Sequence, residues 1–176
     1  MSLRSFKRFE NEVSLRLKEA ARSAWARRLW AVVAHSADSA VVIPCLFVLW
    51  WLHGFSWQSL VIPVAVGFAL SVVATSIVKF AVRRRRPVGD WGVIYRRIDP
   101  HSFPSGHASR TITMTIVVMA GGYFLIGTAL LFWSLLVGLS RIILGVHYLY
   151  DVLAGYLLGV GVGVGMWLLM AFGILF

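Results

Sequence analysis

Long apolar segments separated by short polar ones run through most of the chain. Five of them are near or above the roughly 20 residues that cross about 30 Å of hydrocarbon. They are residues 29–53, 57–82, 105–124, 126–144 and 147–173. Because backbone polar groups in lipid must pair internally, we expect these segments to be helices. The pattern predicts an all-α, polytopic transmembrane bundle of about five spans.

The first 28 residues follow a different pattern. Apolar positions from Phe6 to Trp25 recur at helical spacing among many basic residues, which predicts an amphipathic helix lying in the membrane interface. An ordinary solvated helix packed on the bundle fits the same pattern. We therefore divide the chain into an interfacial helix, 1–28, and a transmembrane domain, 29–176.

Composition and charge support this assignment. The 176 residues are 59% hydrophobic and carry a formal net charge of +10. Excess base in a membrane protein indicates the cytoplasmic face or contact with anionic headgroups. A nucleic-acid partner is not favoured, because the basic residues lie beside apolar spans. The one cysteine, Cys45, cannot form an intrachain disulfide and is interpreted as a buried core residue.

Glycines recur in the last apolar segment. Gly155, Gly159 and Gly163 are spaced by four residues, with Gly161 and Gly165 beside them. Small residues on one helix face let transmembrane helices approach closely. A nucleotide-binding loop is not favoured, since no strand precedes these glycines and no Lys-Ser/Thr pair follows.

Lys79, Arg86 and Pro87 form the first of three polar groups beside the spans. Arg86 follows Lys79 by two helical turns, so we expect both side chains on one helix face. Pro87 disfavours helix at the residue before it and is expected to mark the helix exit. Two cations at the membrane surface can bind a dianionic headgroup, whereas the run 83–86 taken alone indicates an interfacial anchor.

The second group is the sequence Pro104-Ser105-Gly106-His107. Ser105 is predicted to cap a helix N-terminus, whose unpaired N–H groups suit an anion. Gly106 lets a phosphate approach the backbone, and His107 in the first turn can face the same anion. A capping turn with an incidental histidine fits this motif equally well.

The third group is Ser140-Arg141 followed by His147 and Asp151. The spacing of four predicts that His147 and Asp151 share one helix face. The carboxylate can then accept from one imidazole nitrogen and leave the other as a nucleophile. For this pair alone, a structural hydrogen bond is the alternative.

Chain topology connects the three groups. In a five-span bundle, the end of the second span, the start of the third, the end of the fourth and the start of the fifth lie on one side. Three cations, a helix N-terminus, two histidines and an aspartate are therefore predicted to meet there. The opposite loops, 53–56 and 121–127, carry almost no charge.

The three groups together resemble the signature of the type 2 phosphatidic acid phosphatase superfamily. That signature is Lys, six residues, Arg-Pro; then Pro-Ser-Gly-His; then Ser-Arg, five residues, His, three residues, Asp. Every fixed position of it is present, in order, between Lys79 and Asp151. The resemblance implies a membrane lipid phosphatase.

The resemblance also implies a role for each residue. His147 would attack phosphorus and become a phosphohistidine, Asp151 would orient it, and His107 would protonate the leaving oxygen and then activate water. The phosphate oxygens would be bound by Lys79, Arg86, Ser105, Gly106 and Arg141. No metal or other cofactor is expected, since no carboxylate cluster suited to magnesium is present.

Four other polar residues lie near these groups. Arg110, one turn after His107, and His101 are candidates for substrate contact. His35 and Asp38 are three residues apart and are interpreted as a structural polar pair inside the bundle.

The substrate is left open among several lipids. Undecaprenyl diphosphate, phosphatidylglycerol phosphate, phosphatidic acid and lipid A phosphates all suit this chemistry. A non-catalytic lipid-phosphate-binding protein is the first alternative, although simple binding would need only the cations. A vanadate-dependent haloperoxidase-like enzyme is the second, although those enzymes are soluble. The oligomeric state is also left open.

The expected location is the bacterial cytoplasmic (inner) membrane. Many members of the family have six spans and an external active site, whereas here the amphipathic helix takes the place of the first span. The positive-inside rule favours a cytoplasmic site. The two indications of orientation therefore disagree.

Overall fold

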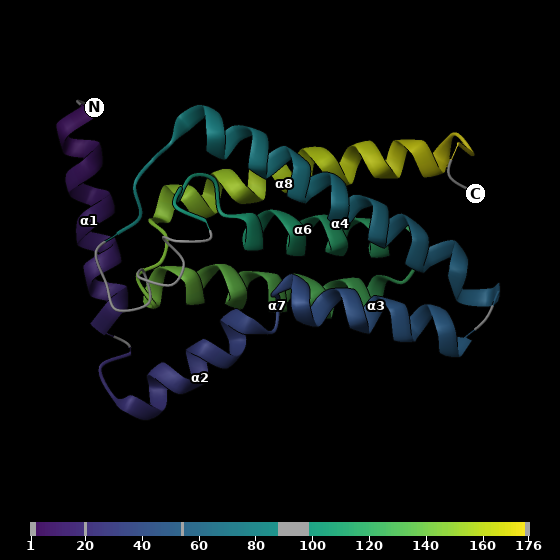
Figure 1. Ribbon diagram of the computed structural model, residues 1–176, viewed down its shortest axis with the longest axis horizontal. Helices are drawn as coiled ribbons and strands as arrows, with labels where there is room; N and C mark the ends of the chain where they lie inside the picture. The colour runs from purple at the N-terminus through teal and green to yellow at the C-terminus, as the bar shows by residue number, and fades with distance from the viewer. Residues whose placement is uncertain (1–2, 20, 54, 88–98, 175–176) are drawn as a thin grey trace.

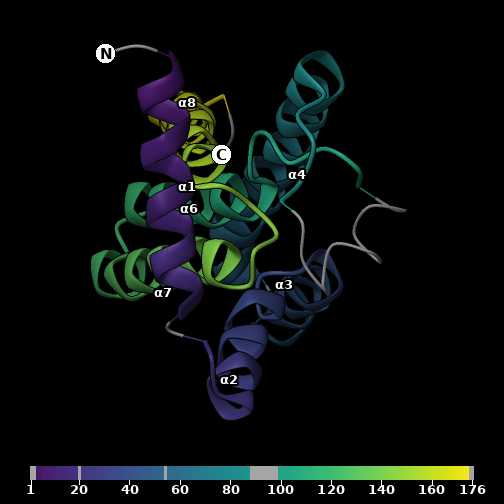
Figure 2. The same cartoon turned by 90° about the vertical axis from the view of Figure 1, so that its left-hand side faces the viewer.

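The computed structural model describes residues 3–19, 21–53, 55–87 and 99–174, and these form helices and no β-strand. The helices lie mostly lengthwise beside one another, and the N-terminal helix crosses one end of the bundle (Figures 1 and 2). The helices are α1 (Leu3–Glu19), α2 (Ala24–His35), α3 (Ser39–His53), α4 (Phe55–Val82), α6 (Gly106–Ala120), α7 (Phe124–Ile143) and α8 (Leu149–Ala171). The predicted all-α bundle is confirmed.

Three to four of the described helices can cross a membrane. Most of α4 (Ser59–Val82), together with α7 and α8, is long and apolar enough, and α2 with α3 forms a fourth candidate bent by 51°. Helix α6 has 15 residues, which gives a length of about 22 Å, below the thickness of the hydrocarbon core. The predicted count of about five included 105–124, whose helix is shorter than expected.

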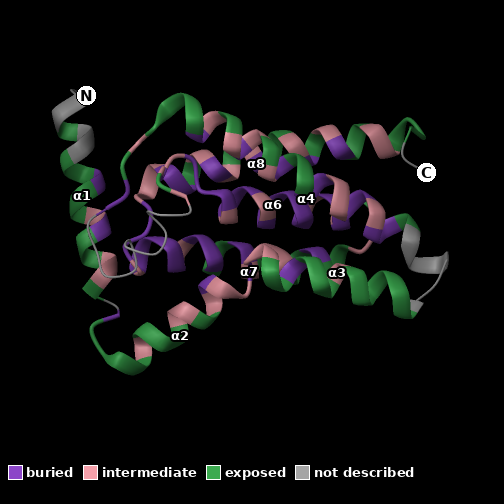
Figure 3. Ribbon diagram, viewed as in Figure 1, coloured by how far each residue is buried: buried purple, intermediate pink, exposed green. Residues whose placement is uncertain are grey.

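Helix α6 is the inner helix of the bundle. It packs against α4, α7 and α8, and most of its residues are buried (Figure 3). Two of its hydroxyls are paired across these contacts: that of Thr113 donates to the carbonyl of Gly159 at 2.8 Å, and that of Thr111 lies 2.8 Å from the hydroxyl of Ser134. Such pairs let a polar helix remain inside a membrane protein. The helix carries the Pro-Ser-Gly-His turn to one end of the bundle.

The glycines of α8 allow α6 to approach closely, as the sequence predicted. Gly155, Gly159 and Gly163 are buried. A Cβ placed on Gly159 would lie 2.3 Å from the carbonyl oxygen of Ser109, whereas one on Gly161 would meet nothing within 4 Å. Only the face of α8 turned towards α6 therefore requires glycine.

Cys45 is exposed rather than buried in the core, so that prediction is wrong. It lies on α3, which packs on α4 at the side of the bundle. The neighbouring Ile43 and Phe47 are also exposed. An apolar residue on this helix can face lipid as readily as protein.

The single helix predicted within residues 1–28 is instead two helices. The hydroxyl of Ser23 accepts a hydrogen bond from the amide of Ala26 at 3.1 Å and starts α2. Residue 28 therefore lies inside α2. Helix α1 packs on α7 and α8 with Glu10 and Ser14 buried, while its Phe9 is about half exposed.

The contact between α6 and α8 predicts opposite outcomes for two glycine substitutions. Gly159→Ala would force a methyl group against a carbonyl oxygen, and overpacking of this kind costs about 1–3 kcal/mol. Gly161→Ala adds the same methyl group in open space and should leave stability unchanged or slightly raised. Thermal unfolding in detergent should show a lower Tm for Gly159→Ala only; equal melting temperatures would contradict the packing.

Candidate active site

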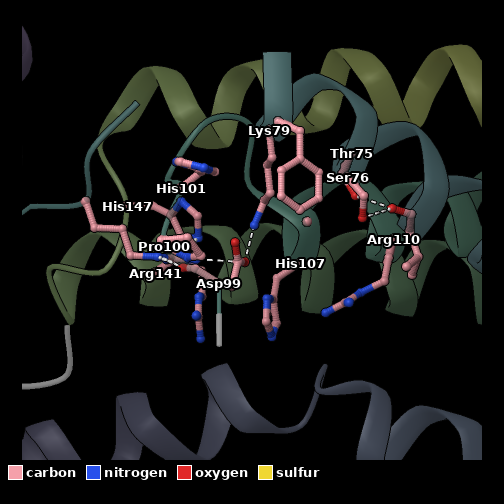
Figure 4. A pocket seen from close by; sticks show the side chains of 14 residues that line it. Thr75, Ser76, Lys79, Asp99, Pro100, His101, His107, Arg110, Arg141 and His147 are labelled. Carbon is pink, nitrogen blue, oxygen red and sulfur yellow. Dashed lines mark hydrogen bonds and ion pairs between the residues drawn. The ribbon is translucent and has the colours of Figure 1, made fainter. Parts of the chain in front are cut away.

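One cavity of about 270 Å³ collects the polar groups at the end of the bundle (Figure 4). Its walls come from the end of α4, the segment 99–101, the first turns of α6, the end of α7 and the segment before α8. The sequence-predicted residues that line it are Lys79, Arg86, His101, Gly106, His107, Arg110, Arg141 and His147. The other two, Asp151 and Ser105, are buried beside it. Asp151 faces the cavity residue His147, and the amide of Ser105 donates to the carbonyl of Asp151. The predicted meeting of the three groups is thus confirmed.

Arg86 reaches the cavity from an extended segment and not from a helix. Helix α4 ends at Val82, and Arg83 has φ 52°, in the left-handed region. A left-handed residue commonly terminates a helix. In the segment that follows, Arg84 and Arg86 point inward, whereas Arg83 and Arg85 are exposed, as alternation along an extended chain requires. The prediction that Lys79 and Arg86 share a helix face is therefore wrong, although both reach one cavity.

Lys79 and Arg86 together bind a carboxylate. Both form ion pairs with Oδ2 of Asp99, at 2.8 Å from Nη2 of Arg86. Burial alone would raise the pKa of Asp99, but Lys79 and Arg86 hold it below its ordinary value. The two cations therefore already hold an oxyanion. No motif in the sequence indicated Asp99, which lies in a polar segment 20 residues from Lys79.

His147 is buried between a cation and a carboxylate. Its Nε2 lies 3.2 Å from Nη1 of Arg86, and its Nδ1 lies 3.6 Å from Oδ2 of Asp151. The second distance is longer than a hydrogen bond. Burial lowers the pKa of His147 to about 3; Asp151 opposes this shift, while Arg86 and Arg141 add to it. The imidazole is therefore neutral near pH 7 and has a lone pair for nucleophilic attack.

Asp151 is held from the first turn of α8. Because α8 begins at Leu149, His147 lies before the helix, and the prediction that this pair shares a helix face is wrong. Oδ2 of Asp151 instead accepts a hydrogen bond from the amide of Tyr148 at 2.9 Å. The hydrogen bond folds the chain so that His147 still lies beside the carboxylate.

Arg84 connects Asp151 to α1. It donates to Oδ1 of Asp151 at 2.8 Å and to Oε2 of Glu10 at 2.5 Å. Both carboxylates are almost fully buried. Neither Arg84 nor Glu10 was identified from the sequence, because one lies in a run of four arginines and the other in the N-terminal amphipathic pattern.

Ser105 occupies the predicted N-cap position of α6, but its side chain makes no capping hydrogen bond. Its hydroxyl is buried without a hydrogen-bond partner, while its amide donates to the carbonyl of Asp151 at 2.7 Å. A Cβ on Gly106 would meet only the hydroxyl of Thr75, at 3.7 Å. This helix N-terminus therefore leaves room beside its backbone.

The remaining predicted residues complete the cavity wall. Arg141 is buried, and Arg110 lies over the ring of Phe68 at 5.3 Å and donates to the hydroxyl of Ser39 at 3.2 Å. The ring of His101 meets the ring of Phe80 edge-on, with centroids 6.0 Å apart. Together with Lys79 and Arg86, these two arginines give the cavity four cationic side chains, which suit it to a multiply charged anion.

His107 makes a contact that the sequence did not indicate. Its Nε2 lies 2.6 Å from Oδ1 of Asp38, and Oδ2 of Asp38 lies 2.7 Å from Nδ1 of His35. The predicted polar pair of His35 and Asp38 is present and extends to the cavity. Among the described residues, no three His, Cys, Asp or Glu side chains are grouped so as to hold a metal ion.

Comparison with known proteins places most of the chain in one family. The model of the PAP2 superfamily matches residues 60–174. A protein of Escherichia coli (strain K12), provisionally named undecaprenyl-diphosphatase YbjG, is 29% identical over 126 residues, which are 69% of this chain and 63% of that protein. Phosphatidylglycerophosphatase B of Bacillus subtilis (strain 168) is 26% identical over 155 residues, 78% of this chain and 72% of that protein.

A solved structure has the same fold. The first transmembrane PAP2-type phosphatidylglycerolphosphate phosphatase from Bacillus subtilis superposes with a TM-score of 0.68 at 20% identity, over 89% of this chain and 83% of that one.

The ion pairs of Arg84 with Glu10 and Asp151 predict that removal of its charge lowers the stability of the protein. Arg84→Met would leave the carboxylates of Glu10 and Asp151 buried without this cation. Loss of a partner from a buried charged group costs about 1–3 kcal/mol, here reduced because Arg84 is 29% exposed. Arg83→Met removes an equal charge from an exposed side chain and is the matched control. Thermal unfolding should separate the two variants; identical Tm values would show that these ion pairs do not stabilise the protein.

Proposed function

The chain belongs to the PAP2 superfamily and is an integral membrane protein, and we propose that it hydrolyses a phosphate monoester or diphosphate of a lipid through a phosphohistidine on His147. One observation carries the proposal. The buried, neutral His147 shares a cavity with Lys79 and Arg86, which already bind an oxyanion. A nucleophile beside an anion site is the arrangement that phosphoryl transfer needs.

In the first step, Nε2 of His147 attacks phosphorus. The N–P bond forms as the P–O bond to the lipid breaks, and the leaving oxygen takes a proton from His107. Asp151 faces Nδ1 and stabilises the positive charge that develops on the imidazole. The products are the free lipid alcohol, or the lipid monophosphate when the substrate is a diphosphate, and the phosphohistidine.

In the second step, water attacks the same phosphorus. Its oxygen forms the new P–O bond as the N–P bond breaks, and its proton passes to His107. Inorganic phosphate leaves, and both histidines return to their starting states. Lys79, Arg86 and Arg141 neutralise the phosphoryl oxygens in both steps. Since these cations supply the positive charge, we propose that the reaction needs no added metal ion.

The lipid nature of the substrate is supported by the site's position and by the relatives. The cavity lies at the end of a bundle whose outer faces are apolar, where a headgroup can enter while its tail stays in the bilayer. The relatives bear the names of an undecaprenyl-diphosphatase and a phosphatidylglycerophosphatase. We propose a substrate of one of these types, hydrolysed at the bacterial inner membrane.

Loss of the nucleophile should abolish turnover. In detergent with a chelator present, the wild type should release phosphate from lipid phosphates, and His147→Asn should be slower by about 10³-fold or more. Gly161→Ala, altered on an open face of α8, is the control. Rapid quenching with labelled substrate should leave an acid-labile, alkali-stable label on the wild type only. Turnover by His147→Asn would refute the mechanism, and a need for added Mg²⁺ would refute metal independence.

Gly106→Ala should separate binding from stability. The new methyl group fits the empty site, because its nearest neighbour would be 3.7 Å away. It would project beside the helix N-terminus where we place the phosphate, so KM should rise by about tenfold while Tm stays unchanged. An unaltered KM would show that phosphate does not approach this backbone.

A further inference from the structure

A carboxylate from outside the region matched by the family model reaches the cavity. Asp38 lies in the break between α2 and α3, whereas that match begins at residue 60. Its Oδ1 contacts Nε2 of His107 at 2.6 Å, and its Oδ2 contacts Nδ1 of His35 at 2.7 Å. Both distances are typical of charge-assisted hydrogen bonds. The break in the bent helix pair thus places a carboxylate against His107, one of the histidines that line the cavity.

The charges around His107 make this contact important. Arg110 on α6 and Arg141 on α7 also line the cavity, as does Lys79 on α4. Positive neighbours and burial both disfavour a protonated imidazole. A histidine that must donate a proton to a leaving oxygen therefore needs a nearby anion, and Asp38 is the carboxylate in contact with it.

His147 and His107 differ in how closely each contacts its carboxylate. Asp151 is 3.6 Å from His147 and is also bonded to Arg84 and to the amide of Tyr148. Asp38 is 2.6 Å from His107, and its other oxygen faces the imidazole of His35. Asp38 therefore makes the closer contact with its histidine. A closer carboxylate favours the protonated form of an imidazole, so these contacts suit His107 to act as an acid and His147 to act as a base.

We propose that Asp38 is a positioning residue that orients His107 and stabilises its protonated form, so that His107 acts as the general acid, with His35 fixing the second oxygen of Asp38. The contact assigns Nε2 of His107 to Asp38, so Nδ1 is the nitrogen that delivers the proton to the leaving oxygen. This inference rests on the proposed function, because it specifies the group that acts through His107 in that reaction.

The test compares two phosphate monoesters with the same hydrocarbon chain in detergent. One has an aliphatic alcohol as leaving group and requires protonation; the other has a nitrophenol, which leaves as an anion. Asp38→Asn, which keeps the size and removes the charge, should lower the rate ratio of the alcohol ester to the nitrophenol ester by about 10- to 100-fold. Because both rates come from one preparation, the ratio does not depend on how much of the variant is folded.

Ser36→Ala is the matched control. Ser36 lies in the same break, and its hydroxyl accepts a hydrogen bond from Trp133 and donates one to the carbonyl of Val33. Its rate ratio should equal that of the wild type. An unchanged ratio for Asp38→Asn, or an equal decrease for Ser36→Ala, would overturn the assignment. Absence of turnover of both esters by the wild type would instead refute the proposed function itself.

Discussion

The first turns of α6 and α8 are joined by their backbones, and the positions of the reacting groups follow from this contact. The amide of Ser105 donates to the carbonyl of Asp151 at 2.7 Å, and a Cβ on Gly155 would lie 2.4 Å from the carbonyl oxygen of Ser105. Because the contact is between main chains, side-chain motion cannot loosen it. It sets the anion-binding helix N-terminus and the segment bearing His147 at a fixed separation, which phosphoryl transfer requires.

The electrostatic environment suits two histidines to different proposed roles. The cavity concentrates positive charge, which suits a phosphate but disfavours protonated imidazole. This suits the proposed nucleophile His147, because attack requires a neutral ring. It opposes the acid role proposed for His107, and a carboxylate from the α2–α3 break lies against that ring. One cationic cavity can therefore contain one imidazole suited to act as a base and another suited to act as an acid, provided that their contacts with carboxylates differ.

Much of this arrangement could be predicted from the sequence. Apolar segment length predicted the helices, and alternation of span ends predicted that Lys79, His107 and His147 would meet. Helical spacing failed at two helix ends: α4 ends before Arg86, where Arg83 leaves the helix, and α8 starts after His147, with Tyr148 as its N-cap. The backbone conformation of such single residues is decided by tertiary contacts. The contacts of Asp38 with His107, of Asp99 with Lys79 and of Arg84 with Asp151 were missed for a related reason. The partners lie 69, 20 and 67 residues apart, and no local pattern encodes such contacts.

The carboxylate of Asp99 itself occupies the anion-binding position. Its carboxylate is tethered to the chain that carries Lys79 and Arg86, so its effective concentration at these cations is high and constant. Any phosphate that binds both cations through the same donors must first displace it, and the apparent affinity is reduced by the equilibrium constant of that internal pair. In the proposed reaction the same competition would act in reverse when inorganic phosphate departs, because the carboxylate would re-form its ion pairs. Such an internal competitor would weaken the binding of substrate and product alike and so favour release of the product.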